Sequence, residues 1–97
     1  MSNVANIGPR KKEIRSLIAR ANFEQAFKRL IDFSDDFADG SKYQNEVIVV
    51  CAEFNSLEDD QRVGLLDYNL MKQQRNQIIF RVLKIIDKIY SDRIEFG

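Results

Sequence analysis

Two long apolar-periodic stretches meet at a hinge that runs from Gly64 to Asp67, and this junction constrains the fold more than any other feature. In both stretches, apolar side chains recur at steps of three and four, which places one apolar stripe along a helix. The stripe residues are Tyr43, Val47, Val50, Phe54 and Leu57 before the hinge, and Ile78, Val82, Ile85 and Ile89 after it. Two such helices joined by a tight turn are predicted to pack as an antiparallel pair.

Two shorter helices are predicted before this pair. The first runs from about Pro9 to Ala21, because a proline suits the first turn of a helix. The second begins after Asn22, which can cap it, with Gln25 as the reciprocal capping partner. This second helix is expected to fade near Asp36.

The boundaries of the two long helices follow from glycine and capping residues. Gly40 can take the left-handed conformation that ends a helix, and Ser41 can cap the next one. The third helix is therefore predicted from Lys42 to about Val63, where Gly64 ends it. Its apolar face is expected to be wide near its start and to include the residues Val47, Ile48, Val50 and Cys51.

The fourth helix is predicted from Tyr68 to about Tyr90, with Asp67 as its cap. Its second half contains consecutive apolar residues, so we expect it to be covered on most sides as the central helix of the core. Residues 91–97 are expected to fray, although Ile94 and Phe96 have the character to pack. The predicted fold is all-α: a compact antiparallel four-helix bundle with two shorter N-terminal helices and two long ones.

The length of 97 residues suits one domain, which we place at residues 9–97 after a flexible N-terminal tail over residues 1–8. The 15 basic and 15 acidic side chains cancel, and a neutral domain has little long-range attraction to nucleic acid or to anionic lipid. A single cysteine, no long apolar run and no signal-peptide layout at the N-terminus predict a cytoplasmic protein without a membrane partner.

No residue pattern in the chain predicts catalysis. Histidine is absent, which excludes Ser-His-Asp and Cys-His arrangements and removes the usual acid–base group. Zinc and di-iron sites need histidine or several cysteines, and no glycine-rich loop is present to hold phosphate. Cys51 lies in the most apolar run and is interpreted as a buried core residue. We predict that the protein is not an enzyme and has no metal or other cofactor.

The first helix is locally basic, and two interpretations follow. It carries Arg10, Lys11, Lys12, Arg15 and Arg20. Two short helices with a tight turn resemble a helix-turn-helix, but the neutral net charge disfavours nucleic acid as the partner. A solvated face, or a basic docking patch for an acidic protein partner, is the favoured interpretation.

The polar first half of the fourth helix leaves two interpretations open. In the first, this half is a solvent-exposed extension beyond the core. In the second, Arg75 and Asn76 hydrogen-bond to the third helix or face a partner.

Five short motifs stand out along the chain: Tyr43-Gln44-Asn45-Glu46-Val47-Ile48, Phe54-Asn55-Ser56-Leu57, Arg62-Val63-Gly64-Leu65-Leu66-Asp67, Arg75-Asn76-Gln77-Ile78 and Leu83-x-x-Ile86-Asp87. These motifs resemble the effector-associated domains of bacterial conflict systems, and the resemblance covers roughly residues 13–90. A helical hairpin resembling residues 14–33 precedes them, and one departure is Leu66-Asp67, where a small hydroxyl residue is expected as the cap. Asn45, Asn55, Gly64 and Asn76 match positions that are characteristic of the family.

The resemblance implies a non-enzymatic, death-like adaptor that couples sensor and effector proteins by like-with-like association in prokaryotic defence or programmed cell death. Its partner would carry a similar domain, or be a second copy of this chain. The alternatives are a nucleic-acid-binding bundle that uses the first helix, and a purely structural dimerisation or docking domain. The candidate partner-binding residues are Arg10, Lys11, Arg15, Asp36, Asp39, Glu58, Asp59, Arg75 and Asn76.

Overall fold

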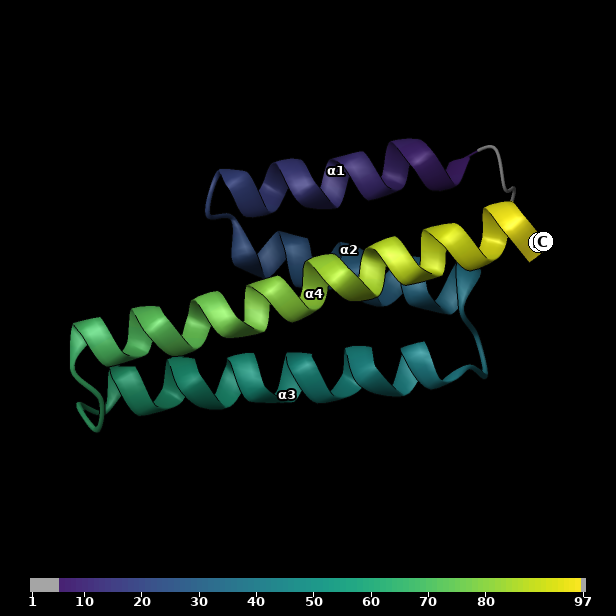
Figure 1. Ribbon diagram of the computed structural model, residues 1–97. Helices are drawn as coiled ribbons and strands as arrows, with labels where there is room; N and C mark the ends of the chain where they lie inside the picture. Colours follow the sequence, from purple (N-terminus) through teal and green to yellow (C-terminus); the bar gives the residue numbers. More distant parts are fainter. Residues whose placement is uncertain (1–5, 97) are drawn as a thin grey trace.

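The computed structural model describes residues 6–96, and the chain forms four α-helices in this range (Figure 1). They are α1 (Ile7–Ala19), α2 (Phe23–Phe37), α3 (Lys42–Arg62) and α4 (Tyr68–Phe96). The first two form one hairpin and the last two form another, and α4 contacts all three other helices. The predicted all-α four-helix bundle is confirmed. It is elongated, with principal extents of 45 × 25 × 18 Å.

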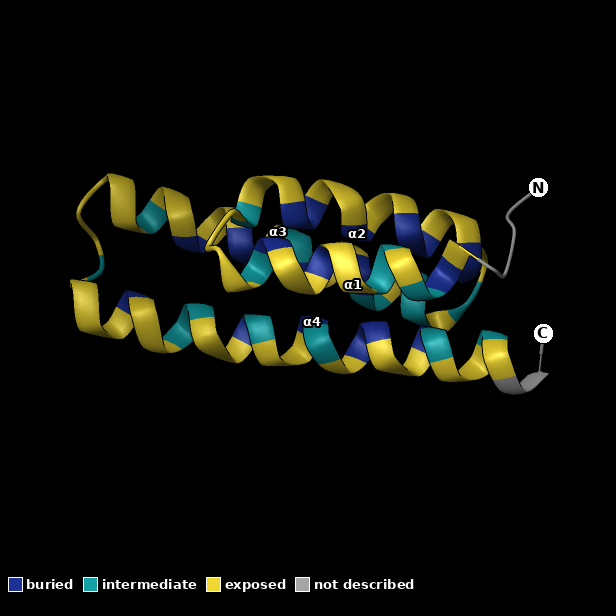
Figure 2. Cartoon of the chain, turned by 90° about the horizontal axis from the view of Figure 1, so that it is seen from above, coloured by how far each residue is buried: buried dark blue, intermediate teal, exposed yellow. Residues whose placement is uncertain are grey.

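The core lies along the facing stripes of the four helices (Figure 2). Leu30 and Phe33 of α2, Val50 of α3 and Ile86 of α4 have no exposed surface at all. The stripes predicted on both sides of the hinge supply most of the remaining core, because spacing of three and four keeps successive side chains on one face. Burial of this stripe supplies the main driving force for folding.

The first helix begins at Ile7, two residues before its predicted start at about Pro9, so residues 7 and 8 belong to the helix. Ile7 is buried and lies seven residues before Ile14, on the same face of the helix, so its burial extends the core stripe. Pro9 then falls inside the first turn, where its missing N–H costs nothing. Residues 1–5 of the predicted tail lie outside the described residues.

The first helix also ends earlier than predicted, at Ala19, because the chain turns at Ala21. Ala21 has a φ of 58°, and its N–H donates to the carbonyl of Ile18 at 2.9 Å. The N–H of Asn22 donates to the carbonyl of Leu17 at 2.8 Å. These two bonds are the Schellman pattern that closes a helix, here with alanine where glycine is usual.

The predicted capping of α2 by the Asn22 side chain is wrong, since that side chain makes no capping hydrogen bond. The ψ of Asn22 is 70°, outside the extended region that a capping residue normally adopts. The bond from its N–H to Leu17 fixes this backbone, so the turn between the helices takes precedence over the cap.

The boundaries around the two long helices agree with the sequence. Gly40 and Gly64 have φ values of 76° and 80°. Ser41 accepts a hydrogen bond from the N–H of Tyr43 at 3.2 Å, and Asp67 accepts one from the N–H of Leu70 at 2.8 Å. The hinge therefore ends α3 on a left-handed glycine and starts α4 on a carboxylate cap.

Three expectations about the long helices are corrected. The second half of α4 is not covered on most sides, because Phe80 is 67% exposed. Ile48 is 62% exposed, so the wide apolar face predicted for α3 does not all turn inward. The helix α4 continues to Phe96 instead of fraying after Tyr90, and Ile94 is half exposed on it. In each case the side chain lies on the face opposite the core stripe, where no other helix is available to cover it.

Candidate interaction surfaces

The basic residues of α1 are largely engaged within the protein. Arg10 pairs with Asp36 of α2, and its guanidinium carbon lies 5.1 Å from the centroid of the Phe37 ring. Lys11 Nζ lies 2.9 Å from a carboxylate oxygen of Asp87 on α4, and Arg15 Nη1 lies 3.9 Å from the same oxygen. The structure therefore brings four of the predicted interaction residues into ion pairs, and these pairs join α1 to its neighbours.

The remaining acidic candidates lie apart from these pairs. Asp59 pairs with Arg62 one turn later on α3. Asp39 and Glu58 are exposed, and neither forms an ion pair with any side chain described over residues 6–94. The predicted opposition of a basic first helix and two acidic ends is thus only partly available to a partner, because Arg10, Lys11 and Arg15 already pair with carboxylates of the same chain.

The two candidates on α4 have different surroundings. Arg75 lies with its guanidinium carbon 5.1 Å from the centroid of the Phe23 ring, and its buried Nε has no hydrogen-bond partner among the described residues. Asn76 is exposed. Arg75 therefore contacts α2 rather than forming the predicted hydrogen bond to α3, while Asn76 is left on the surface.

An exposed face of α3 was missed by the sequence analysis. Ile48 and Val49 are 62% and 47% exposed. The helical spacing places them beside other exposed residues opposite the buried stripe. We call this the α3 outer face, and it consists of Asn45, Ile48, Val49, Ala52, Asn55 and Ser56.

No charged residue belongs to the α3 outer face. The only charges between its first and last residues are Glu46 and Glu53, which lie at the edge toward α4. There Glu53 pairs with Arg81 of α4. Because an exposed helix face is normally polar or charged, a neutral and partly apolar one is a candidate interaction surface. The two characteristic asparagines Asn45 and Asn55 both belong to it.

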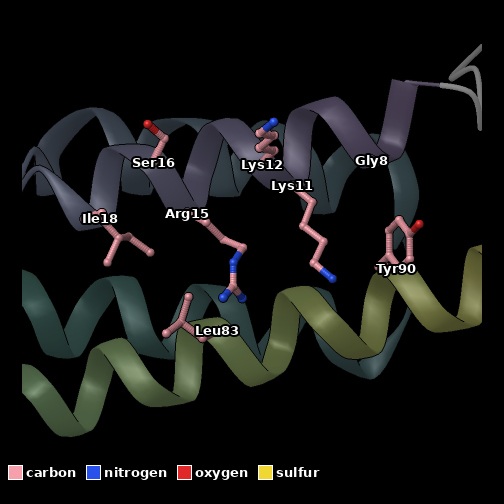
Figure 3. A pocket seen from close by; sticks show the side chains of 9 residues that line it. Gly8, Lys11, Lys12, Arg15, Ser16, Ile18, Leu83 and Tyr90 are labelled. Carbon is pink, nitrogen blue, oxygen red and sulfur yellow. The ribbon is translucent and has the colours of Figure 1, made fainter.

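A second missed feature is a groove between α1 and α4 (Figure 3). It has a volume of about 650 Å³. Helix α1 contributes a basic edge, and Leu83 and Tyr90 of α4 lie opposite it. No local signal marks such a groove, because it depends on how far apart two helices distant in the sequence are held.

Cys51 is half-buried against the core rather than fully buried as predicted. Desolvation by burial raises the pKa of its thiol above the ordinary value of 9.0. The thiolate is the nucleophilic form, so this environment makes the thiol less reactive.

No cluster of potential metal ligands is present among residues 6–96. None of the helices in that range combines the length and hydrophobicity needed to cross a bilayer.

The class of protein that this fold defines is a small all-α domain of two packed helical hairpins. Within that class, the chain belongs to the family described as Effector-associated domain 11, whose family model matches residues 9–90. The resemblance inferred from the sequence motifs is thereby confirmed. Searches of curated proteins and of solved structures found no match. Effector-associated domains are generally regulatory modules with an adaptor-like role in effector proteins.

Proposed function

We propose that this domain is a non-enzymatic adaptor of the death-like type. It couples sensor and effector proteins in prokaryotic defence or programmed cell death by binding a similar domain. The observation that carries the proposal is the family match over residues 9–90, which covers all of the packed core except Ile7.

The exposed residues of the bundle favour the α3 outer face as the associating surface. Its apolar centre is Ile48 and Val49, and no charge interrupts it. A neutral face meets an identical face without like-charge repulsion, so a second copy of the chain is the simplest partner. By contrast, Arg10, Lys11 and Arg15 already hold carboxylates of the same chain. Association is therefore expected to depend little on salt concentration.

Sedimentation velocity over a range of protein concentrations tests the proposal. The wild-type chain is expected to self-associate reversibly, and Ile48→Glu is expected to abolish association because it places a charge in the apolar contact. Leu65→Glu is the matched control, since Leu65 is 72% exposed at the hinge and outside the α3 outer face. Circular dichroism establishes that both variants remain folded.

Two results would overturn the proposed surface. One is association that persists in Ile48→Glu at wild-type strength. The other is association that weakens steeply with salt, which would indicate the charged faces instead.

A further inference from the structure

The groove between α1 and α4 differs from the α3 outer face in both shape and charge. Its apolar lining comes from Ile18 and Ala19 of α1 together with Leu83 and Tyr90 of α4. Its basic edge consists of Lys11, Lys12 and Arg15. Figure 3 shows the Lys11 and Arg15 side chains pointing from α1 toward α4.

The charges along this groove do not balance. Asp87 forms ion pairs with both Lys11, at 2.9 Å, and Arg15, at 3.9 Å, so one carboxylate faces two cations. Lys12 is exposed beside them and forms no ion pair with the side chains that the structure describes, those of residues 6–94. The Lys11 ammonium also lies 4.3 Å from the centroid of the Tyr90 ring, which positions it at the groove. An apolar surface with excess positive charge at its edge complements an acidic, amphipathic ligand.

We propose that this groove binds an acidic amphipathic helix presented by a partner protein. The site is separate from the α3 outer face and does not depend on the proposed like-with-like association. A helix in a groove is recognised through apolar anchors one turn apart, with charges beside them that set specificity. Here the anchors pack on Ile18, Leu83 and Tyr90, and carboxylates beside them pair with Lys11, Lys12 and Arg15.

The length of the groove along α1 suits a bound helix. The lining residues of α1 extend from Gly8 to Ala19, which corresponds to about three helical turns, or roughly 16 Å. Small side chains at Gly8, Ser16 and Ala19 leave room for a second backbone to approach α1. A Cβ added at Gly8 would be in van der Waals contact with Tyr90 Cε2, at 3.9 Å, so the Tyr90 ring borders the groove at this end.

Asp87 marks a position at which a carboxylate is already held by α1. A carboxylate on the incoming helix competes with Asp87 for Lys11 and Arg15. Removing the Asp87 charge should therefore strengthen binding of an acidic helix. This gain distinguishes a binding groove from a purely structural set of ion pairs, in which the same change would affect only stability.

The test uses a fluorescent synthetic peptide of about four helical turns, with leucines on one face and glutamates elsewhere. A shuffled peptide of the same composition has no apolar face. Fluorescence anisotropy is expected to show binding of the amphipathic peptide only, with affinity that falls as salt is added. Lys11→Glu/Arg15→Glu should weaken binding about tenfold or more, whereas Asp87→Asn should strengthen it about threefold.

The matched control is Lys28→Glu/Arg62→Glu, which makes the same charge change at exposed basic residues outside the groove. It should leave the affinity within about twofold of wild type, because charges beyond a Debye length are screened. Ile48→Glu should also retain peptide binding, so failure of the like-with-like proposal and failure of this one are distinguishable.

Four results would overturn the inference. The first would be equally strong binding of the shuffled peptide. The second would be a loss of affinity in the control variant as large as that in the groove variant. The third would be binding of vesicles with anionic headgroups to the groove without binding of the peptide. The fourth would be loss of self-association of the Lys11→Glu/Arg15→Glu variant in sedimentation, because a second copy of the chain would then be the occupant of the groove.

Discussion

The guanidinium carbon of Arg75 on α4 lies 5.1 Å from the centroid of the Phe23 ring at the start of α2. The same ring lies 5.6 Å from the Phe54 ring of α3 at an interplanar angle of 55°, and Phe27 stacks on Phe54 at 4.5 Å. Phe23 therefore joins three helices near the hinge end of the bundle, through one cation–π contact and one tilted aromatic contact.

Phe23→Leu should lower the free energy of unfolding by about 1–2 kcal/mol, because it removes both ring interactions and keeps an apolar side chain. Urea denaturation measures the change. Phe80→Leu is the control, since Phe80 is 67% exposed and its replacement should change stability by less than about 0.5 kcal/mol. Equal effects of the two variants would contradict the role given to Phe23.

Ala21 and Gly64 both have a left-handed backbone conformation, so exchanging alanine and glycine should have opposite effects on stability at the two positions. Ala21→Gly should stabilise the protein by about 1 kcal/mol, because it relieves the steric cost of alanine at a φ of 58°. Gly64→Ala should destabilise it by about 1 kcal/mol, since no atom lies near a new Cβ and only the φ of 80° opposes it. Thermal unfolding measures both, and a loss of stability in Ala21→Gly would contradict the turn geometry.

The Asp67 cap at the hinge predicts that substitutions at this position lower stability to different degrees. Asp67→Ala should cost about 1 kcal/mol, because the N–H of Leu70 loses its 2.8 Å acceptor. Asp67→Ser should restore most of the loss, because a hydroxyl also caps. Urea midpoints compare the three proteins. If serine and alanine destabilise equally, the hydrogen bond is not the source of the effect.

The hinge was predictable from the sequence because its signals are local. Gly64 and Asp67 act through their own backbone and side chain, and the apolar stripes on each side fix which faces meet. The start of α1 was missed although Ile7 lies in phase with Ile14, because Pro9 gave a stronger local signal. The turn at Ala21 gives no signal, since alanine is ordinarily a helix former.

The surfaces were harder to predict than the helices. The run of apolar residues around Ile48 predicted a wide buried face, but the sequence does not say how wide a stripe the neighbouring helices cover. The basic character of α1 was visible, but its pairing with Asp87 was not, because that contact depends on the packing of the first helix against the last. Arg75 was singled out for a hydrogen bond to the third helix or for a partner, and the contact that the structure shows is with an aromatic ring on α2.

Burial of Cys51 predicts slow alkylation in the folded state. Desolvation raises the pKa of the thiol above 9.0, so at pH 8 the folded protein holds less thiolate than the unfolded chain. Iodoacetamide should therefore react more slowly with the native protein than with the urea-unfolded protein at the same pH. Equal rates would contradict the burial.

The raised pKa of the Cys51 thiol also predicts how the stability of the fold changes with pH. As the pH rises above 9.0, the unfolded thiol ionises while the folded thiol stays neutral, so this group's contribution to stability declines. The contribution is fully present at neutral pH. Cys51→Ala should reduce the part of the alkaline loss of stability that the thiol causes, as measured by urea midpoints at pH 8 and about pH 10.

The measurement that tests the central claim most directly is a concentration series of ¹H–¹⁵N correlation spectra of the labelled chain. If the domain associates with its like through the α3 outer face, the amides of Ile48, Val49 and Ala52 should shift progressively as the concentration rises. Those of Lys11 and Arg15 should stay in place. Spectra that do not change with concentration, or shifts confined to the groove between α1 and α4, would contradict the claim.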